Sequence, residues 1–170
     1  LTVNVLEGPY AGCDGGLNLC SNSAQLQLAT GLNCGPDAGG TWFDPDGDLH
    51  GPTFNPAVDP PGDYAYVVAA IGDCTADTAF VTVNVTPAPD AGENGSLAIC
   101  STDNATDMFT VLGPNAQAGG SWVYVTGGNT GHSPLYTPAI DNPGVYQYTV
   151  LGQGTCSNAT ALVVVSEPQA

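Results

Sequence analysis

The chain has 170 residues, no lysine or arginine, and sixteen aspartates and glutamates, which give it a formal net charge of −16. A surface that follows a phosphate backbone is built from lysine and arginine, so this composition excludes nucleic acid as a partner. It also argues against docking on an anionic bilayer. No apolar run is long enough to span a membrane, and we expect no membrane insertion.

The chain is organised by an internal repeat. The sequence Ala-Gly-Gly-Thr-Trp at Ala38–Trp42 returns as Ala-Gly-Gly-Ser-Trp at Ala118–Trp122. A period near 80 residues predicts two small domains in tandem. We place them at residues 9–86 and 87–170, and we assign residues 1–8 to a separate N-terminal strand and linker.

The N-terminal strand is the first predicted element. Leu1, Thr2, Val3, Asn4 and Val5 alternate apolar and polar side chains and include β-branched residues, as strands do. They resemble the segment that closes the first repeat, so they are surplus to both domains. We expect them to be the last strand of a preceding repeat or a strand that completes the sheet of a partner.

Within the first domain, strands are predicted at Leu17–Cys20, Gln25–Leu28, Gly62–Val68 and Val81–Val85. The Gly-Gly pair before the tryptophan allows a tight turn, and we expect the indole to fill the space between two sheets. No segment has the 3.6-residue period of a helix. Many short strands separated by glycine and proline predict an all-β chain of two tandem Ig-like β-sandwich domains. The second domain repeats these strands at residues 97–100, 108–111, 144–150 and 162–165.

The cysteines predict disulfides and therefore an extracellular location. Fifteen connectivities are possible for six cysteines. The repeat favours one of them, because Cys20 corresponds to Cys100 and Cys74 to Cys156, and the second copy has only that pair. The alternative is a zinc site, but no C-x-x-C spacing occurs. The favoured pairs are Cys20–Cys74, Cys100–Cys156 and Cys13–Cys34.

Several blocks at constant spacing carry a family resemblance. They are Pro89–Cys100, the Ala-Gly-Gly-Ser-Trp motif, Pro143–Val150 and Cys156–Ala161. The pattern resembles the Ig-like or PKD-like tandem repeats of large bacterial surface proteins, of the kind found in Bacteroidetes-type adhesins and gliding-motility-associated proteins. The resemblance implies a secreted, surface-displayed, non-enzymatic spacer or adhesive module. Cys13, Cys34 and the absence of basic residues depart from it.

The two copies differ most in the loop after the tryptophan. In the first copy this loop carries Asp44, Asp46 and Asp48 at alternate positions, with Gly47 between the last two. Calcium takes oxygen ligands at such spacing, although the loop lacks the glutamate that completes an EF-hand. The sequence predicts either a calcium site or an aspartate-rich turn, and no cofactor is required.

Glycosylation acceptors are a second kind of candidate site. Asn-x-Thr/Ser sequons matter only in a host with the corresponding machinery. The segment Asp77-Thr78-Ala79 also resembles the acceptor of bacterial surface O-glycosylation, which makes Thr78 a candidate. The sequons lie at Asn84, Asn94, Asn104 and Asn158.

No combination of residues predicts catalysis. His50 and His132 occupy corresponding loops without a nucleophile at a suggestive spacing, and we interpret them as loop residues. Tyr10, Tyr124 and Tyr136 are candidates for stacking on sugar rings, with core or linker packing as the alternative. We expect a non-enzymatic extracellular structural or adhesive module whose partners are copies of itself in a fibre or array. A carbohydrate-binding module using loop aromatics, with or without calcium, is the alternative.

Overall fold

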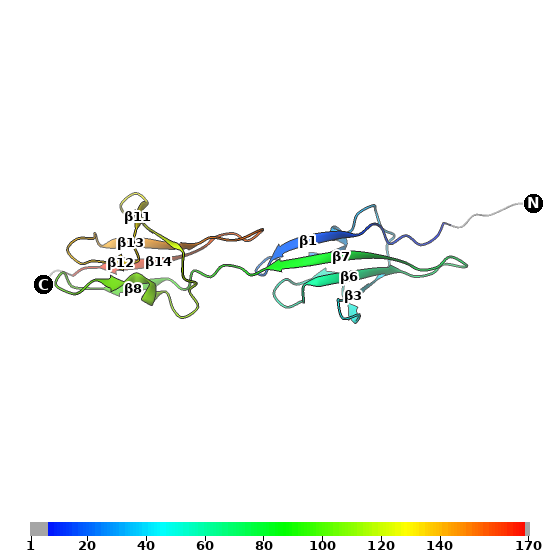
Figure 1. Cartoon of the computed structure of the whole chain (residues 1–170), viewed down its shortest axis with the longest axis horizontal. Coiled ribbons are helices and arrows are strands. Elements are labelled where there is room, and N and C mark those ends of the chain that lie inside the picture. Colours follow the sequence, from blue (N-terminus) through cyan, green and yellow to red (C-terminus); the bar gives the residue numbers. More distant parts are fainter. Residues whose placement is uncertain (1–6, 169–170) are drawn as a thin grey trace, which may run out of the picture. The chain divides into compact units, whose positions relative to one another are not determined.

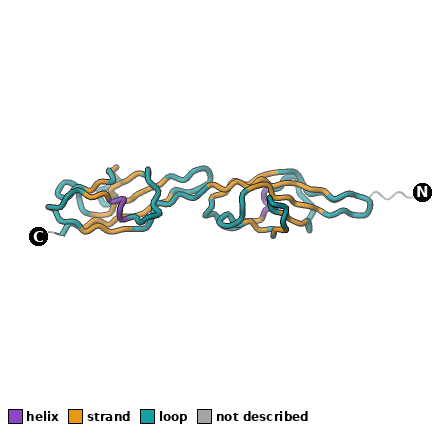
Figure 2. The backbone as a smooth tube through the Cα atoms, turned by 60° about the horizontal axis from the view of Figure 1, so that its bottom comes forward, coloured by secondary structure: helices purple, strands orange, loops and turns teal. Residues whose placement is uncertain are grey.

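The computed structural model describes residues 7–168 (Figure 1). The chain divides into two compact units, Leu1–Pro87 (unit 1) and Ala88–Ala170 (unit 2). Both consist of short strands and one single-turn 3-10 helix each (Figure 2). Within the described residues, no helix is long and apolar enough to cross a membrane. The predicted all-β class is confirmed.

Unit 1 is a sandwich of one large and one small sheet. The large sheet has the strand order β1-β7-β6-β3-β4, and β2 pairs with β5 in the small one. All of these pairs are antiparallel except β1 with β7, whose parallel register runs from Gly15 beside Val81 to Cys20 beside Thr86. The elements are β1 (Gly15–Cys20), β2 (Leu26–Gln27), η1 (Leu28–Gly31), β3 (Thr41–Phe43), β4 (Leu49–His50), β5 (Thr53–Phe54), β6 (Gly62–Val68) and β7 (Asp77–Thr86).

Unit 2 repeats this topology. Its large sheet has the order β11-β10-β13-β14-β8, and β12 pairs with β9. The strand β8 lies parallel to β14, with Gly95 beside Val163, so the first and last strands of each unit are hydrogen-bonded neighbours. The elements are β8 (Gly95–Ala98), β9 (Thr106–Asp107), η2 (Met108–Val111), β10 (Ser121–Tyr124), β11 (Thr130–His132), β12 (Leu135–Tyr136), β13 (Gly144–Val150) and β14 (Ala159–Ser166).

The repeated tryptophan fills the core of each unit, as the sequence predicted. Trp42 is 4% exposed and Trp122 is 5% exposed. Their ring centroids lie 4.8 Å from Tyr66 and 5.0 Å from Tyr148, respectively. In antibody domains a disulfide joins the two sheets at this level. Here the indole and the tyrosine ring occupy the centre of each sandwich instead.

The Gly-Gly pair is required by the same tyrosine. The amide of Gly40 donates to the hydroxyl of Tyr66 at 2.8 Å, and that hydroxyl donates to the carbonyl of Asp37. A Cβ atom on Gly40 would lie 2.4 Å from the tyrosine Cζ. The preceding Gly39 has φ +89°, in the left-handed region that favours glycine. The motif is therefore a backbone turn that caps the buried tyrosine, and it recurs at Gly119 and Gly120.

The second predicted strand of each unit is largely wrong. Only Leu26–Gln27 and Thr106–Asp107 are extended, and the residues that follow form the helices η1 and η2. In unit 2 the Asp107 side chain accepts the amide of Phe109 and so starts the turn. The turn still buries Leu28 and Met108, which explains why alternation alone indicated a strand.

Two of the three predicted disulfides are wrong. Cys13 and Cys34 are bonded, with an S–S distance of 2.05 Å, but Cys74 and Cys100 are free. Because β1 runs parallel to β7, Cys20 lies beside the last residue of β7, whereas Cys74 lies in the hairpin before its first residue. Ten residues of strand separate those levels by about 30 Å, and a disulfide needs Cα atoms within roughly 7 Å.

The same reasoning excludes Cys100–Cys156. Cys100 follows β8 and lies near the end of β14, while Cys156 lies in the hairpin before β14 begins. The eight residues of β14 span about 23 Å. Cys20 and Cys156 are each disulfide-bonded. The repeat correctly identified which cysteines correspond between the units, but the two cysteines predicted to pair within each unit lie at its opposite ends.

Candidate functional site

The predicted calcium loop is the hairpin between β3 and β4. One carboxylate oxygen of Asp44 accepts the amides of Asp46 and Asp48 at 3.0 and 2.9 Å. Gly47, at φ +87°, allows the turn to close. In residues 7–168 no group of three or more acidic, histidine or cysteine side chains is placed to hold a metal ion. Asp44 thus shapes a turn, and the calcium site stays a prediction.

The five predicted glycosylation acceptors are all exposed. Three of the asparagines also make hydrogen bonds through their side chains. The Asn94 oxygen accepts the amide of Leu162, and the Asn158 oxygen accepts the amide of Gly152. The amide of Asn84 donates to Asn18 across β1 and β7. Exposure is compatible with modification, which stays a prediction for Thr78, Asn84, Asn94, Asn104 and Asn158.

The three candidate sugar-stacking tyrosines have different surroundings. Tyr136 is fully buried, so it offers no face to a ligand and the interpretation as a core residue is confirmed. Tyr124 is partly buried against Tyr146 and donates to the carbonyl of Pro143. Tyr10 is 41% exposed and its hydroxyl lies 3.4 Å from Cys13 Sγ. The three do not form one platform within either unit.

Both histidines make more contacts than their interpretation as simple loop residues predicts. In unit 1, His50 Nε2 lies 3.5 Å from the Asp59 carboxylate and its ring packs edge-on against Tyr64. The Tyr64 hydroxyl donates to the carbonyl of Pro60, four residues earlier. This hydrogen bond resembles the tyrosine corner of immunoglobulin-type sandwiches. The cluster ties the turn before β6 to the strand β4.

Unit 2 has the same cluster. His132 Nε2 lies 3.2 Å from Asp141, its ring packs on Tyr146, and Tyr146 donates to the carbonyl of Asn142. A signal for it was present in the sequence. The separations from histidine to aspartate and from aspartate to tyrosine are identical in the two copies, although the loop before them differs in length. Equal spacing on both sides of a variable loop indicates a structural contact.

Burial changes the ionisation of the core tyrosines. It raises the pKa of Tyr64 to about 12, with smaller contributions from the charges of Asp59 and Asp44. Burial likewise raises the pKa of Tyr146 to about 12. The pKa of Tyr136 is raised further, by burial and then by its hydrogen bond to Glu167. All three stabilise the folded chain only in their neutral form.

Each unit receives the chain at one end and releases it at the other. We call the end that holds the hairpin between the last two strands the entry pole. In unit 1 the entering chain contacts this pole, where the Ala11 amide donates to Asp77 at the start of β7. We call the opposite end the exit pole. There the Ser21 amide donates to the carbonyl of Thr86, the last residue of β7. Within a unit, the chain thus enters and leaves at opposite poles.

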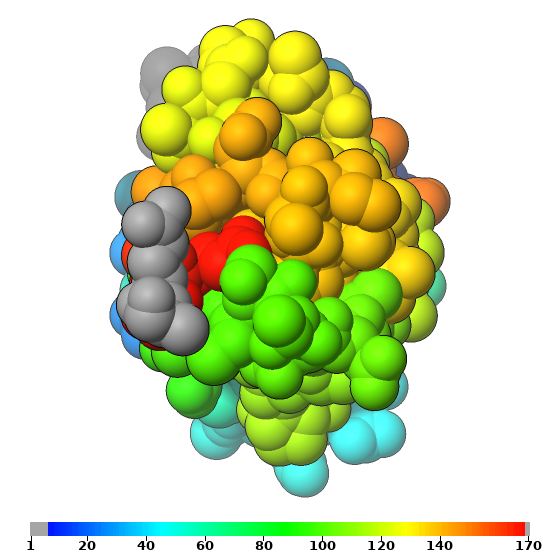
Figure 3. Space-filling model, turned by 90° about the vertical axis from the view of Figure 1, so that its left-hand side faces the viewer, coloured from blue at the N-terminus to red at the C-terminus, as the bar shows by residue number. Residues whose placement is uncertain are grey.

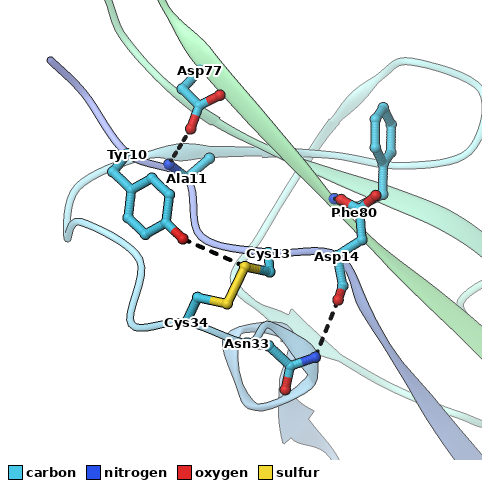
Figure 4. The surroundings of a disulfide bond; sticks show 8 residues. All are labelled: Tyr10, Ala11, Cys13, Asp14, Asn33, Cys34, Asp77 and Phe80. Carbon is cyan, nitrogen blue, oxygen red and sulfur yellow. Dashed lines mark hydrogen bonds between the residues drawn. A yellow bond between two sulfur atoms is a disulfide. The ribbon is translucent and has the colours of Figure 1, made fainter.

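The Cys13–Cys34 disulfide staples the entry side of unit 1 (Figure 4). Cys13 and Cys34 join the segment before β1 to the loop after η1, and their Cα atoms lie 5.4 Å apart. Beside them Asn33 donates to the carbonyl of Asp14, whose side chain accepts the amide of Phe80. These bonds hold the incoming chain against β7.

The exit pole of unit 2 carries a hollow of about 580 Å³. It lies between residues near 100 (green) and residues near 140 (orange), with the end of the described chain (red) between them (Figure 3). Ile140, 78% exposed, is among its lining residues. The Glu167 carboxylate accepts from Tyr136 and from the amide of Ala139, which fixes the rim. The surface is therefore a built hollow with an exposed apolar side chain.

The predicted assembly strand, Leu1, Thr2, Val3, Asn4 and Val5, lies outside the described residues. The longest edges that the described sheets offer to an added strand are β1 and β8. The strand addition stays a prediction.

No protein-family model matches the chain, and no curated protein sequence matches it. Among solved structures, it is similar to an I-band fragment I67–I69 from titin, with a TM-score of 0.54 and 10% identity over 95% of this chain. An E-to-A variant of the same three-Ig structure gives the same values. The chain spans 66% of the titin fragment. At this identity the likeness shows the fold, and the prediction of tandem Ig-like sandwiches is confirmed.

Proposed function

We propose that this chain is a non-enzymatic, extracellular structural module whose Ig-like units act in series within a surface fibre. The observation that carries the proposal is the parallel pairing of the first and last strands in each unit, β1 with β7 and β8 with β14. Chain entry and exit then lie at opposite poles, as a serial element requires. The bacterial surface repeats that the sequence resembles supply the proposed setting.

The same pairing makes each unit resist tension. A force along the chain pulls the start of β1 one way and the end of β7 the other. The hydrogen bonds between them lie across that direction, because strands are bonded sideways. They are therefore sheared together and do not open one after another. The Cys13–Cys34 disulfide adds a covalent link close to the start of β1.

The remaining features suit an extracellular setting. A disulfide persists in an oxidising compartment and is rare in the cytosol. The uncompensated charge of −16 keeps neighbouring molecules apart and soluble. Each histidine is held by an aspartate and covered by a tyrosine, which gives it a structural role.

Single-molecule pulling tests the mechanical role. The full chain, with Cys20 and Cys156 replaced by serine because both are disulfide-bonded, is stretched between its two ends. In a control the force is applied between the N-terminal end and a handle inserted at Gly72. Gly72 lies in the hairpin at the entry pole, so the control peels β1 from β7 bond by bond. We expect severalfold higher unfolding force for unit 1 in the end-to-end geometry. Equal forces would contradict the proposal.

Assembly is tested separately. Electron microscopy of the native material shows whether the chain is a filament subunit, and deletion of residues 1–8 tests strand addition. We expect the deletion to abolish filaments, and unchanged filaments would refute that step.

A glycan array examines the carbohydrate-binding alternative, with Tyr10→Ala as the variant because that tyrosine is the exposed candidate.

A further inference from the structure

Apart from the bonded pair Cys13 and Cys34 in unit 1, each unit has one cysteine at each pole. In unit 1, Cys74 lies at the entry pole, and Cys20 at the exit pole beside Thr86. In unit 2, Cys156 lies in the entry hairpin, and Cys100 follows β8 at the exit pole. The local backbone is alike at corresponding positions. The Cys20 and Cys100 amides donate to side chains three residues later, Ser23 and Asp103.

The oxidation states divide these four cysteines in a regular way. Cys20, at the exit pole of unit 1, and Cys156, at the entry pole of unit 2, are disulfide-bonded. Cys74, at the entry pole of unit 1, and Cys100, at the exit pole of unit 2, are free. An exit-pole cysteine and an entry-pole cysteine thus remain as thiols in every molecule of this chain. Cys74 occupies the position in unit 1 that the oxidised Cys156 has in unit 2, and Cys100 the position in unit 2 that the oxidised Cys20 has in unit 1.

The surroundings of the two thiols favour contact with another copy. Cys74 closes the tip of the entry hairpin by a pair of backbone hydrogen bonds with Ile71, and Ile71 is 51% exposed. Cys100 is exposed and is followed by Ser101, which lines the hollow that also contains Ile140. One pole therefore presents a narrow tip with an exposed isoleucine beside a thiol, and the other a hollow beside a thiol.

We propose that Cys100 of one copy forms a disulfide with Cys74 of a second copy, so that successive copies are joined head to tail. This inference rests on the proposed serial function and gives it a covalent joint. A low-molecular-weight disulfide such as oxidised glutathione serves as the oxidant. The Cys100 thiolate attacks it, releasing one glutathione thiolate. The Cys74 thiolate then attacks the mixed disulfide, forms the Cys100–Cys74 bond and releases the second.

The charges at the poles explain why a covalent joint is useful. Asp73 lies in the tip of the entry hairpin and Asp77 at the start of β7, and Asp103 and Glu167 lie at the exit pole. With no basic residue in the chain, the two poles repel each other at low ionic strength. Salt screens such repulsion. The joint should form faster as ionic strength rises, and it holds against the repulsion once formed.

Two single variants test the pairing. Cys74→Ser keeps only the exit thiol and Cys100→Ser keeps only the entry thiol. Each is oxidised alone and in an equal mixture with the other, one of them labelled with nitrogen-15, in a glutathione redox buffer at several salt concentrations. Non-reducing electrophoresis and mass spectrometry then count the linked species. We expect the wild type to give a ladder and the mixture to stop at dimers.

Dimers that link the two variants should outnumber same-variant dimers by about tenfold, which needs only a modest docking preference. Random pairing would make half of the dimers mixed and would overturn the inference. So would a wild-type chain that stays monomeric in the oxidising buffer. Pulling data separate this result from the proposed function, since the force geometry within unit 1 does not depend on Cys74 or Cys100. A chain with high end-to-end unfolding force that gives no ladder in the oxidising buffer would leave the function standing and remove the joint.

Discussion

The two units have the same scaffold and stabilise it differently. Both keep the Gly-Gly turn under a buried tyrosine and the histidine–aspartate–tyrosine cluster. Only unit 1 has a disulfide before its first strand. In unit 2, Glu93 occupies the position of Cys13, and its amide makes a backbone hydrogen bond to Leu112 in place of the bond from Cys13 to Asn33. The disulfide thus reinforces a connection that a backbone hydrogen bond already makes in both units.

A second difference is a coupled exchange in the core. Phe54 and Val85 in unit 1 correspond to Tyr136 and Glu167 in unit 2. Val85 packs on the core that contains Phe54, whereas the Tyr136 hydroxyl donates to the Glu167 carboxylate at 3.0 Å. The carboxylate and its hydroxyl donor are both present or both absent, because a polar group that is buried without a partner costs free energy. The hydroxyl has a second acceptor in the carbonyl of Asp141, at 3.2 Å. Two positions that contact each other therefore change together between the units.

The shared turn gives the largest expected effect. Gly120→Ala should lower the unfolding free energy of unit 2 by about 3–4 kcal/mol, because overpacking at a fixed backbone is costly. The new Cβ would lie 2.4 Å from the Thr149 carbonyl and 2.6 Å from the Tyr148 ring. Gly40→Ala meets only the Tyr66 side chain and should cost unit 1 less. Urea unfolding, read separately from each unit by fluorine-19 on its tryptophan, measures both.

The matched controls are Gly39→Ala and Gly119→Ala. Neither new Cβ would touch anything, but both residues have positive φ. Each should cost only about 1 kcal/mol. Equal losses at the two glycines of a pair would contradict the role assigned to the tyrosine.

Removing the staple is next in size. The Cys13→Ser/Cys34→Ser double variant should destabilise unit 1 by about 3 kcal/mol, the entropy of closing a loop of that length. The bonded cysteines are 21 residues apart. Unit 2, which has no counterpart, should keep its unfolding midpoint in the same fluorine-19 experiment. An equal shift in both units would show that the disulfide does not act locally.

Periodicity and the repeat predicted the strands well where one face is buried along the whole element. β6 and β13 have the predicted bounds, Gly62–Val68 and Gly144–Val150, because their alternation matches a half-buried strand. Alternation failed at Met108–Val111, since a single 3-10 turn also buries its first residue. Pattern alone does not distinguish a short strand from a turn that inserts one side chain into the core.

The disulfides show a different limit. The repeat identified which cysteines correspond, but pairing depends on strand direction, and neither Cys20 nor Cys74 carries that information. Only the parallel pairing of β1 with β7 places them at opposite poles. The histidine cluster shows a related limit, because its signal lies in the equality of the spacings between the two copies and not in the residues around either histidine.

Alkaline pH should produce a smaller difference between the two units in their free energy of unfolding. The pKa values of Tyr64 and Tyr146 are raised to about 12 from an ordinary value of 10, and that of Tyr136 is raised as well. Below pH 10 both folded and unfolded tyrosines are neutral, and the stabilisation is complete. Between pH 10 and 12 the unfolded chain ionises first, so each tyrosine removes about 1.4 kcal/mol per pH unit. Unit 2, with two such tyrosines, should lose stability about twice as steeply.

Urea unfolding at pH 9, 10 and 11, with Cys74 and Cys100 blocked against disulfide exchange, measures the two slopes. Tyr136→Phe gives unit 2 the residue that unit 1 has at Phe54, and it should bring the slopes together. Parallel slopes in the unaltered chain would contradict the assignment of Tyr136 as a second titrating group in unit 2.

The acidic loop should give the smallest effect, confined to unit 1. Asp44→Ala removes the acceptor of two backbone amides and should cost about 1 kcal/mol. Asp46→Ala and Asp48→Ala each remove a charge but do not remove the acceptor of these amides. They should therefore change the unfolding free energy by less than about 0.5 kcal/mol. A calcium titration on the same variants decides between the two readings of the loop. A rise in the unit 1 melting temperature that Asp46→Ala and Asp48→Ala abolish would establish a cation site, whereas no rise would leave Asp44 as a turn residue alone.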